Sequence, residues 1–130
     1  MGTGDVQLVE QVFAAFAARD VDALIELADP QVEFFAMTAA EAGRTTPYRG
    51  HEGLRRYFRD VAEVWEELRL VPTEFRQVGE YVLVTGRVSA RSHSRVVSGS
   101  SGWIWRVEGG LVVYGRVYPS ASEALASLEA

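Results

Sequence analysis

The chain has 130 residues, the length of one domain with a core of its own. Its 48% hydrophobic and 24% charged residues are typical of a soluble globular protein, and its net charge of −5 argues against nucleic acid or an anionic membrane as a partner. The absence of cysteine excludes disulfides and thiolate chemistry, and no apolar run approaches the ~20 residues of a membrane-spanning helix. Because the N-terminus also lacks a signal pattern, we expect a cytoplasmic protein.

The first third of the sequence predicts two helices, a strand and a loop. A first helix ends near Arg19, and Asp20 is a suitable N-cap for a second, shorter one. Pro30 stops that helix, because proline disfavours helical backbone at the residue before it. The bulky run 32–37 then suits a strand, and the segment 38–50, rich in Thr, Ala, Gly and Pro, is typical of a loop.

A long amphipathic helix is predicted over residues 51–68. Apolar side chains recur at helical spacing along one stripe, whereas arginines and acidic residues occupy the other faces. The stripe consists of Leu54, Phe58, Val61, Trp65 and Leu68.

The remainder predicts an antiparallel sheet and a last helix. Strand-like runs cover residues 70–78, 81–91, 95–107 and 111–118, with a hairpin turn at Gly109-Gly110. The Gly/Ser cluster 98–102 predicts a bulge or a sharp bend within the third run, and a capping box at Ser120 predicts a helix to Leu128. This order predicts one α+β domain over residues 1–130, in which a curved sheet wraps around the long helix.

Four short segments, in this order and spacing, carry a resemblance to a known family. They are Ala18-Arg19-Asp20-Val21-Asp22, Asp29-Pro30-Gln31-Val32-Glu33-Phe34, Tyr48-Arg49-Gly50 and Gly109-Gly110-Leu111-Val112. The chain resembles the SnoaL-like and ketosteroid-isomerase-like branches of the nuclear-transport-factor-2-like superfamily. The resemblance implies a cone-shaped, strongly bent sheet around a cavity, often dimeric through the outer sheet face. Its members include isomerases, polyketide cyclases, epoxide hydrolases, dehydratases and non-catalytic binding domains, so fold alone does not choose the function.

The best-known chemistry of these relatives does not transfer to this sequence. Ketosteroid isomerases use an aspartate base with a tyrosine and a protonated aspartate as oxyanion donors. Matched by motif, the tyrosine falls on Val12, the base on Phe34 (or Phe35 with a slip of one residue) and the oxyanion aspartate on Trp103. None of these side chains transfers a proton, so isomerase chemistry by that mechanism is not expected.

The Asp-Arg-Asp set implied by epoxide hydrolases keeps only Arg87, because Ser89 and Val117 stand where the acids would be. Alternation places Arg87 and Ser89 opposite an apolar face made by Val82, Val84, Gly86, Val88 and Ala90. Hydrophobicity alone would turn that apolar face inward. The resemblance instead turns Arg87 into the cavity and leaves the apolar face for a dimer partner, and we adopt this second orientation as the expectation.

Few other side chains could carry a proton. Glu33 and Glu74 are the candidates for the acid on which SnoaL-type cyclases depend, although strand alternation also allows both to face solvent. His51 is either a surface residue of the long helix or an acid or base at the pocket mouth, and His93 lies in a polar loop. No metal-ligand cluster or phosphate-binding loop is present in the sequence, so we expect no metal and no cofactor.

Aromatic residues predict an apolar ligand pocket, with plain core packing as the alternative. The predicted pocket residues are Val12, Phe16, Phe34, Phe35, Met37, Phe58, Trp65, Ser89, Trp103, Trp105 and Val117. One hypothesis is a SnoaL-like domain that binds a small hydrophobic or aromatic molecule and acts on it as an isomerase, cyclase or hydrolase without the usual acid/base set. Its candidate catalytic residues are Arg87, His51 and Glu33. The other hypothesis is a non-catalytic ligand-binding or dimerisation domain, a homodimer through the outer sheet face.

Overall fold

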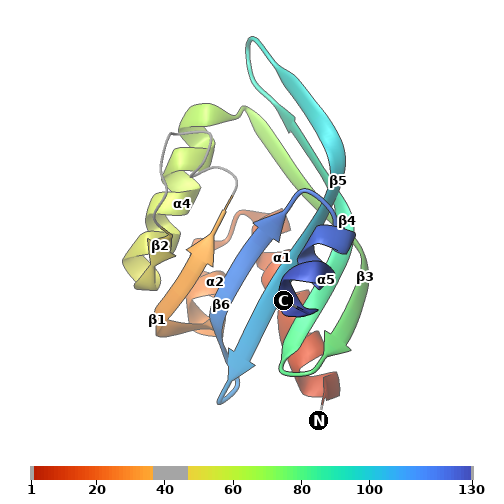
Figure 1. Ribbon diagram of the computed structural model, residues 1–130. Helices are drawn as coiled ribbons and strands as arrows, with labels where there is room; N and C mark the ends of the chain where they lie inside the picture. The colour runs from red at the N-terminus through yellow and green to blue at the C-terminus, as the bar shows by residue number, and fades with distance from the viewer. Residues whose placement is uncertain (1, 37–46, 130) are drawn as a thin grey trace.

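The computed structural model describes residues 2–36 and 47–129 (Figure 1). Its elements are α1 (Gly2–Ala18), α2 (Val21–Leu27), β1 (Ala28–Phe35), β2 (Tyr48–Arg49), α4 (Gly50–Val64), β3 (Glu67–Val78), β4 (Tyr81–Arg91), β5 (Val96–Glu108), β6 (Leu111–Tyr118) and α5 (Ala121–Glu129). Met37, which the sequence predicts for the pocket, and residues 38–46 of the predicted loop lie outside the described residues.

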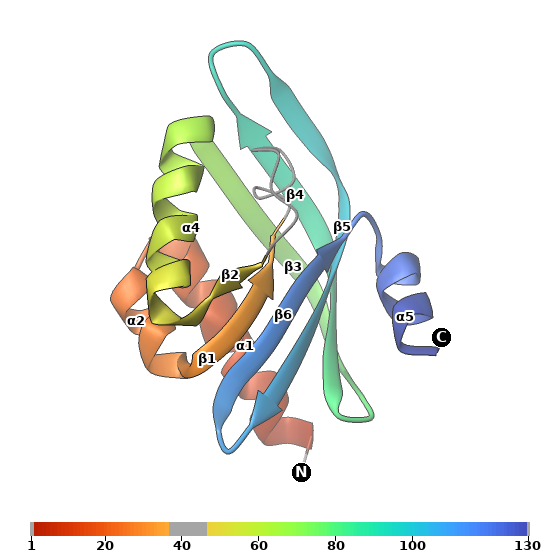
Figure 2. The ribbon, with the colours of Figure 1, turned by 60° about the vertical axis from the view of Figure 1, so that its left-hand side comes forward.

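One mixed sheet organises the described chain. Its six strands run in the order β2-β1-β6-β5-β4-β3, with β1 and β6 parallel and the other neighbours antiparallel. The sheet does not close, so β3 is an open edge. Helices α1, α2 and α4 lie on one side of the sheet and α5 lies on the other (Figure 2). The α+β class and the curved, cone-like arrangement predicted from the sequence are confirmed.

Local sequence signals account for most element boundaries. Strands β4 and β6 have the predicted bounds. The backbone N–H of Glu123 donates to the hydroxyl of Ser120 over 3.2 Å, so the predicted N-cap opens α5. Asp20 likewise caps α2, because its carboxylate accepts a hydrogen bond from the N–H of Ala23 over 3.1 Å.

The long helix is shorter than predicted. Helix α4 ends at Val64, and Trp65 has extended backbone with φ −125° and ψ 134°. Leu68 therefore belongs to β3, where it and Leu70 both pack against the main core. The prediction failed because apolar residues three and four apart continue past the helix end, and from Leu68 onward an alternating pattern takes over.

Of the two alternatives for residues 98–102, the bulge is wrong. Strands β4 and β5 pair without a register shift from Val96 to Arg106. Register shifts occur instead between Arg106 and Val107 of β5, against β6, and between Pro72 and Glu74 of β3. Gly102 is instead required by the close approach of another segment of the backbone. A Cβ there would lie 2.6 Å from the carbonyl oxygen of Ser120, so Gly102 allows the connection to α5 to cross the sheet closely.

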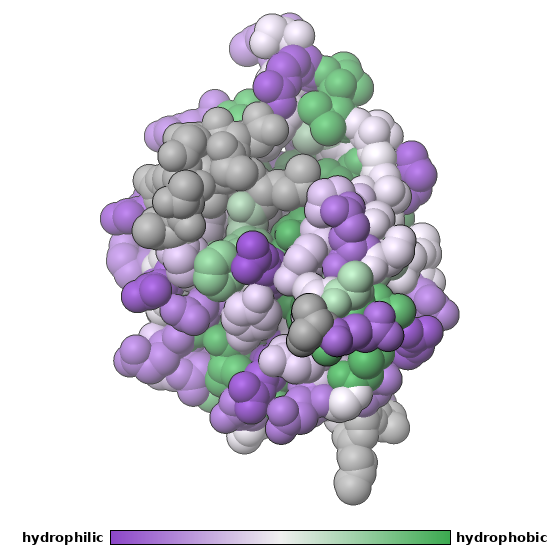
Figure 3. All heavy atoms as spheres, viewed as in Figure 1, coloured by the Kyte–Doolittle hydropathy of each residue, from purple (hydrophilic) through white to green (hydrophobic). Residues whose placement is uncertain are grey.

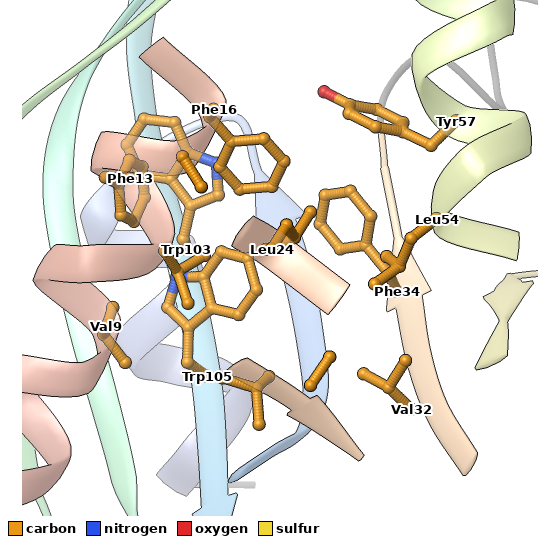
Figure 4. Packing of buried hydrophobic residues seen from close by; sticks show 14 of the residues in the cluster. Val9, Phe13, Phe16, Leu24, Val32, Phe34, Leu54, Tyr57, Trp103 and Trp105 are labelled. Carbon is orange, nitrogen blue, oxygen red and sulfur yellow. The ribbon is translucent and has the colours of Figure 1, made fainter. Parts of the chain in front are cut away.

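The main core is a cluster of aromatic rings on the side of the sheet that carries α1, α2 and α4 (Figure 4). The indole of Trp105 stacks on the ring of Phe34, with centroids 5.6 Å apart and an interplanar angle of 17°. The same indole covers Gly115, its partner on β6, where a Cβ would lie 2.3 Å from the indole Cζ3. Trp105 is therefore enclosed between β6 and Phe34.

Replacing Gly115 by Ala should lower the free energy of unfolding by about 1–3 kcal/mol, the usual cost of overpacking a core. The indole cannot move away from the added methyl group, because Phe34 lies against it. Gly99→Ala is the matched control, since a Cβ at that strand position meets no atom within 4 Å. Urea denaturation measures both variants, and equal midpoints for the two would contradict this packing.

Candidate functional site

Much of the predicted pocket is core. Val12 and Trp103 are 0% exposed, Phe34 is 2% and Trp105 is 3% exposed, and half-buried Val117 packs against them. Val12, Phe34 and Trp103 are also the positions where the isomerase resemblance places its acid/base set. In this chain, those three positions hold apolar and aromatic side chains that pack in the core.

A cleft of about 340 Å³ lies beside this core, at the open edge of the sheet. We call it the edge cleft. Its lining residues come from the end of α1, the middle of α4 and the start of β3: Phe16, Ala17, Arg19, Tyr57, Phe58, Val61, Leu68, Arg69, Leu70 and Val71. Of the predicted pocket residues, Phe16 and Phe58 line it. Its volume falls in the range of small-molecule sites.

The walls of the edge cleft are aromatic and aliphatic. The Phe16 ring lies 5.8 Å from the Tyr57 ring and 6.1 Å from the Phe58 ring, both at steep interplanar angles of 74° and 72°. Val71, although it is 45% exposed, pairs with Arg87 and so points to the outer face. Opposite the rings, the half-buried side chains of Leu68 and Leu70 form the apolar wall. An apolar ligand would cover this surface and be favoured by its removal from water.

The charged residues among the described lining are Arg19 and Arg69. Arg69 pairs with Ser89 of β4, so its side chain points to the outer face. The Nε of Arg69 lies 3.3 Å from a carboxylate oxygen of Glu67, so its charge is already compensated. Arg19 makes no ion pair with any residue that the structure describes. Aspartate, glutamate and histidine do not occur among the described lining residues.

The end of α1 places Arg19 at the edge cleft. The N–H of Arg19 donates to the carbonyl of Phe16 over 3.1 Å, and the N–H of Asp20 donates to the carbonyl of Ala15 over 3.0 Å. This pair of hydrogen bonds is a Schellman motif, whose central residue adopts left-handed backbone and is usually glycine. Arg19 has a φ of 55°, the one positive φ among the described non-glycine residues. The short link between two helices demands this conformation.

The expected orientation of Arg87 is wrong. Val82 and Val84 are buried in the main core and Val88 packs against it, so strand alternation places Arg87 and Ser89 on the outer face. Arg87 is exposed there. The apolar face that the resemblance assigned to a dimer partner forms the core instead, because burial of its three valines is favourable.

Phe35 also faces outward, because it follows the buried Phe34 on a strand. Its ring lies 5.7 Å from the ring of Tyr114, and the guanidinium of Arg116 lies 5.0 Å from its centroid. Glu33 is on the same face, where its carboxylate lies 3.2 Å from the Nε of Arg49. Neither Phe35 nor Glu33 lines the edge cleft.

The outer face of the sheet carries α5 and a second hollow of about 350 Å³, in which Glu33, Tyr81, Tyr114 and Tyr118 take part. Partial burial disfavours the phenolate and raises the pKa of Tyr114 above its ordinary value. Figure 3 shows hydrophilic and hydrophobic side chains mixed over this face. Assembly of two copies through it stays a prediction.

His51 and Trp65 have structural contacts. The Nε2 of His51 lies 2.9 Å from the carbonyl oxygen of Ala28, which ties the start of α4 to β1. Trp65 is buried, and the guanidinium of Arg95 lies 5.3 Å from its ring centroid. Neither residue lines the edge cleft.

Sequence reasoning missed a hydrogen bond next to Tyr57, one of the aromatic residues that line the edge cleft. The hydroxyl of Tyr48 donates to a carboxylate oxygen of Asp60 over 2.6 Å and joins β2 to α4. The Tyr48 ring also contacts the ring of Tyr57, with centroids 5.5 Å apart. Asp60 lies off the apolar stripe of α4, so the helical pattern gave no sign of an inward role.

Several cleft residues were also missed, for different reasons. Tyr57 lies three residues after Leu54, so a wider apolar stripe would have included it. Leu70 was assigned correctly to a strand, but its side of the sheet follows only from the pairing with Val88. Arg19 could have been found from its place between the end of one helix and the Asp20 cap of the next.

The described residues include neither a metal-ligand cluster nor a helix that could span a membrane. No group of three or more His, Cys, Asp or Glu side chains that could hold a metal ion occurs among them. No helix in the described part of the chain is long and apolar enough to cross a membrane.

Comparison with known proteins places the chain in a family. The model of the SnoaL-like domain family matches residues 9–115, and the chain belongs to this family. No curated protein matches the sequence.

Several solved structures share the fold. An NTF2-like protein of unknown function from Burkholderia pseudomallei is 24% identical, with a TM-score of 0.79 over 98% of both chains. TerC, co-crystallised with polyporic acid, is 20% identical, with a TM-score of 0.79 over 98% of this chain and 99% of its own. A putative polyketide cyclase from Sinorhizobium meliloti is 19% identical, with a TM-score of 0.70 over 86% of this chain and 94% of its own.

Replacing Tyr48 by Phe should lower the free energy of unfolding by about 1–2 kcal/mol, because the Asp60 carboxylate loses a charge-assisted hydrogen bond. Tyr81→Phe, which removes a hydroxyl from the half-buried outer face, is the control and should change stability by less than about 0.5 kcal/mol. Chemical denaturation compares the two variants. A Tyr48→Phe variant as stable as the wild type would show that this bond does not hold β2 to α4.

Proposed function

We propose that the protein binds a small, flat aromatic or polycyclic molecule in the edge cleft. The observation that carries this proposal is the half-buried apolar surface of Phe58, Leu68 and Leu70 in a cleft beside a core that is otherwise packed. Rings such as that of Phe58 favour edge-to-face and offset contacts with an aromatic ligand. The side chain of Ala17 leaves space between the α1 and β3 walls.

The comparisons support a small-molecule ligand of this kind. One relative of the same fold was co-crystallised with polyporic acid, and another is a putative polyketide cyclase. Among the described lining residues, those with polar side chains are Arg19, Arg69 and Tyr57. Such groups orient a ligand and polarise a carbonyl, whereas a carboxylate or imidazole would be needed for general acid/base work near neutral pH. Binding is therefore the function that the geometry supports best.

Filling the edge cleft should abolish binding and leave the fold intact. Ala17→Phe places a ring in the cleft, whereas Ala18→Phe adds the same ring at an exposed position of α1 outside the lining. A panel of flat aromatic compounds, with polyporic acid and anthraquinone derivatives among them, is screened by thermal denaturation.

A compound at ten times its Kd stabilises the folded protein by about 1.4 kcal/mol, which corresponds to a rise in melting temperature of about 3–5 °C. The wild type and Ala18→Phe should show this rise with at least one compound, and Ala17→Phe should not. An equal rise in all three proteins would place the ligand elsewhere, and no rise with any compound in the wild type would refute the proposed function.

A further inference from the structure

Among the described residues, Arg19 of the edge cleft has no carboxylate partner. Arg69, the other arginine of the lining, has Glu67 within 3.3 Å, and Glu67 also lies 3.8 Å from Arg91. Arg19 lies at the opposite wall, next to Phe16 and Ala17, without a carboxylate partner among the described residues. The lining thus has a local positive charge, although the whole chain has a net charge of −5.

The backbone at Arg19 adds a second, independent observation. The Schellman motif fixes this residue at a φ of 55°, where glycine is the least strained choice. An arginine there costs stability relative to glycine and contributes no ion pair to the described fold. The link between the two helices explains the backbone at this position, but not why its residue is an arginine.

We propose that Arg19 makes the edge cleft selective for aromatic molecules that carry an acidic group, such as a carboxylate or an acidic enol. The aromatic body of the ligand lies against Phe16 and Phe58, and its anionic group pairs with the Arg19 guanidinium at the rim. A guanidinium suits this role because it offers several donors in a plane that matches a carboxylate. This inference rests on the proposed function and adds the charge of the ligand to it.

The test compares two probes of the same shape and different charge, 2-naphthoate and the neutral 2-naphthamide. Their affinities are measured by isothermal titration calorimetry at pH 7 with the wild type, Arg19→Gly, Arg19→Gln and Arg76→Gln. Arg76 is an exposed arginine of β3 outside the cleft lining, so its variant controls for the loss of one positive charge.

The wild type and Arg76→Gln should bind the acid about fivefold more tightly than the amide, the gain expected of a solvent-exposed ion pair. Both Arg19 variants should bind the two probes equally, and added salt should reduce the preference of the wild type. Arg19→Gly should in addition melt about 3–5 °C higher than the wild type, because glycine relieves the left-handed backbone. Loss of the preference in a more stable protein cannot be attributed to unfolding.

Each other result overturns a defined part of the account. If the wild type binds both probes equally, or if the preference persists in Arg19→Gly and Arg19→Gln, Arg19 does not select acids and the proposed binding function stands. If the wild type binds neither probe, the selectivity fails, and the proposed function fails with it only if the panel of flat aromatic compounds also gives no rise in melting temperature.

Discussion

The enclosure of Trp105 between Gly115 and Phe34 is the contact on which the rest of the structure depends. The indole takes up the space that a side chain at 115 would need, and Phe34 lies stacked on its other side at 5.6 Å. Phe16 and Tyr57 then pack around Phe34, which links α1 and α4 to the sheet. Because these rings fill the base of the curved sheet, the open apolar volume lies at the edge beside β3. The location of the cleft is thus a consequence of how the core is packed.

In this chain, the cone-like fold is present without the acid/base groups that the resemblance to ketosteroid isomerases implies within it. The chain keeps the SnoaL-like architecture, while Val12, Phe34 and Trp103 occupy positions where acid/base groups are implied for ketosteroid-isomerase-like relatives. What the described structure offers a ligand is aromatic surface and positive charge. Under the proposed function, such a site would recognise shape and charge, and a reaction in it would depend on orientation more than on proton transfer.

The sequence predicted the fold better than the site, for physical reasons. Helix caps at Asp20 and Ser120 and the glycine hairpin turn act over three or four residues, so local patterns were enough to place α2, α5 and β6. The orientation of Arg87 depends on which face of β4 is buried, and the apolar alternation indicated the correct face although the family pattern indicated the other. The edge cleft could not be predicted, because it is formed by α1, α4 and β3 together and depends on their packing. The end of α4 was missed because Leu68 fits the helical stripe and the strand pattern equally well.

A crystal structure of the protein with 2-naphthoate tests the central claim most directly. The account predicts the naphthalene rings against Phe16 and Phe58 in the edge cleft, with the carboxylate within hydrogen-bond distance of the Arg19 guanidinium. A ligand bound on the outer face near Tyr114, or in the edge cleft with its carboxylate turned away from Arg19, would contradict it.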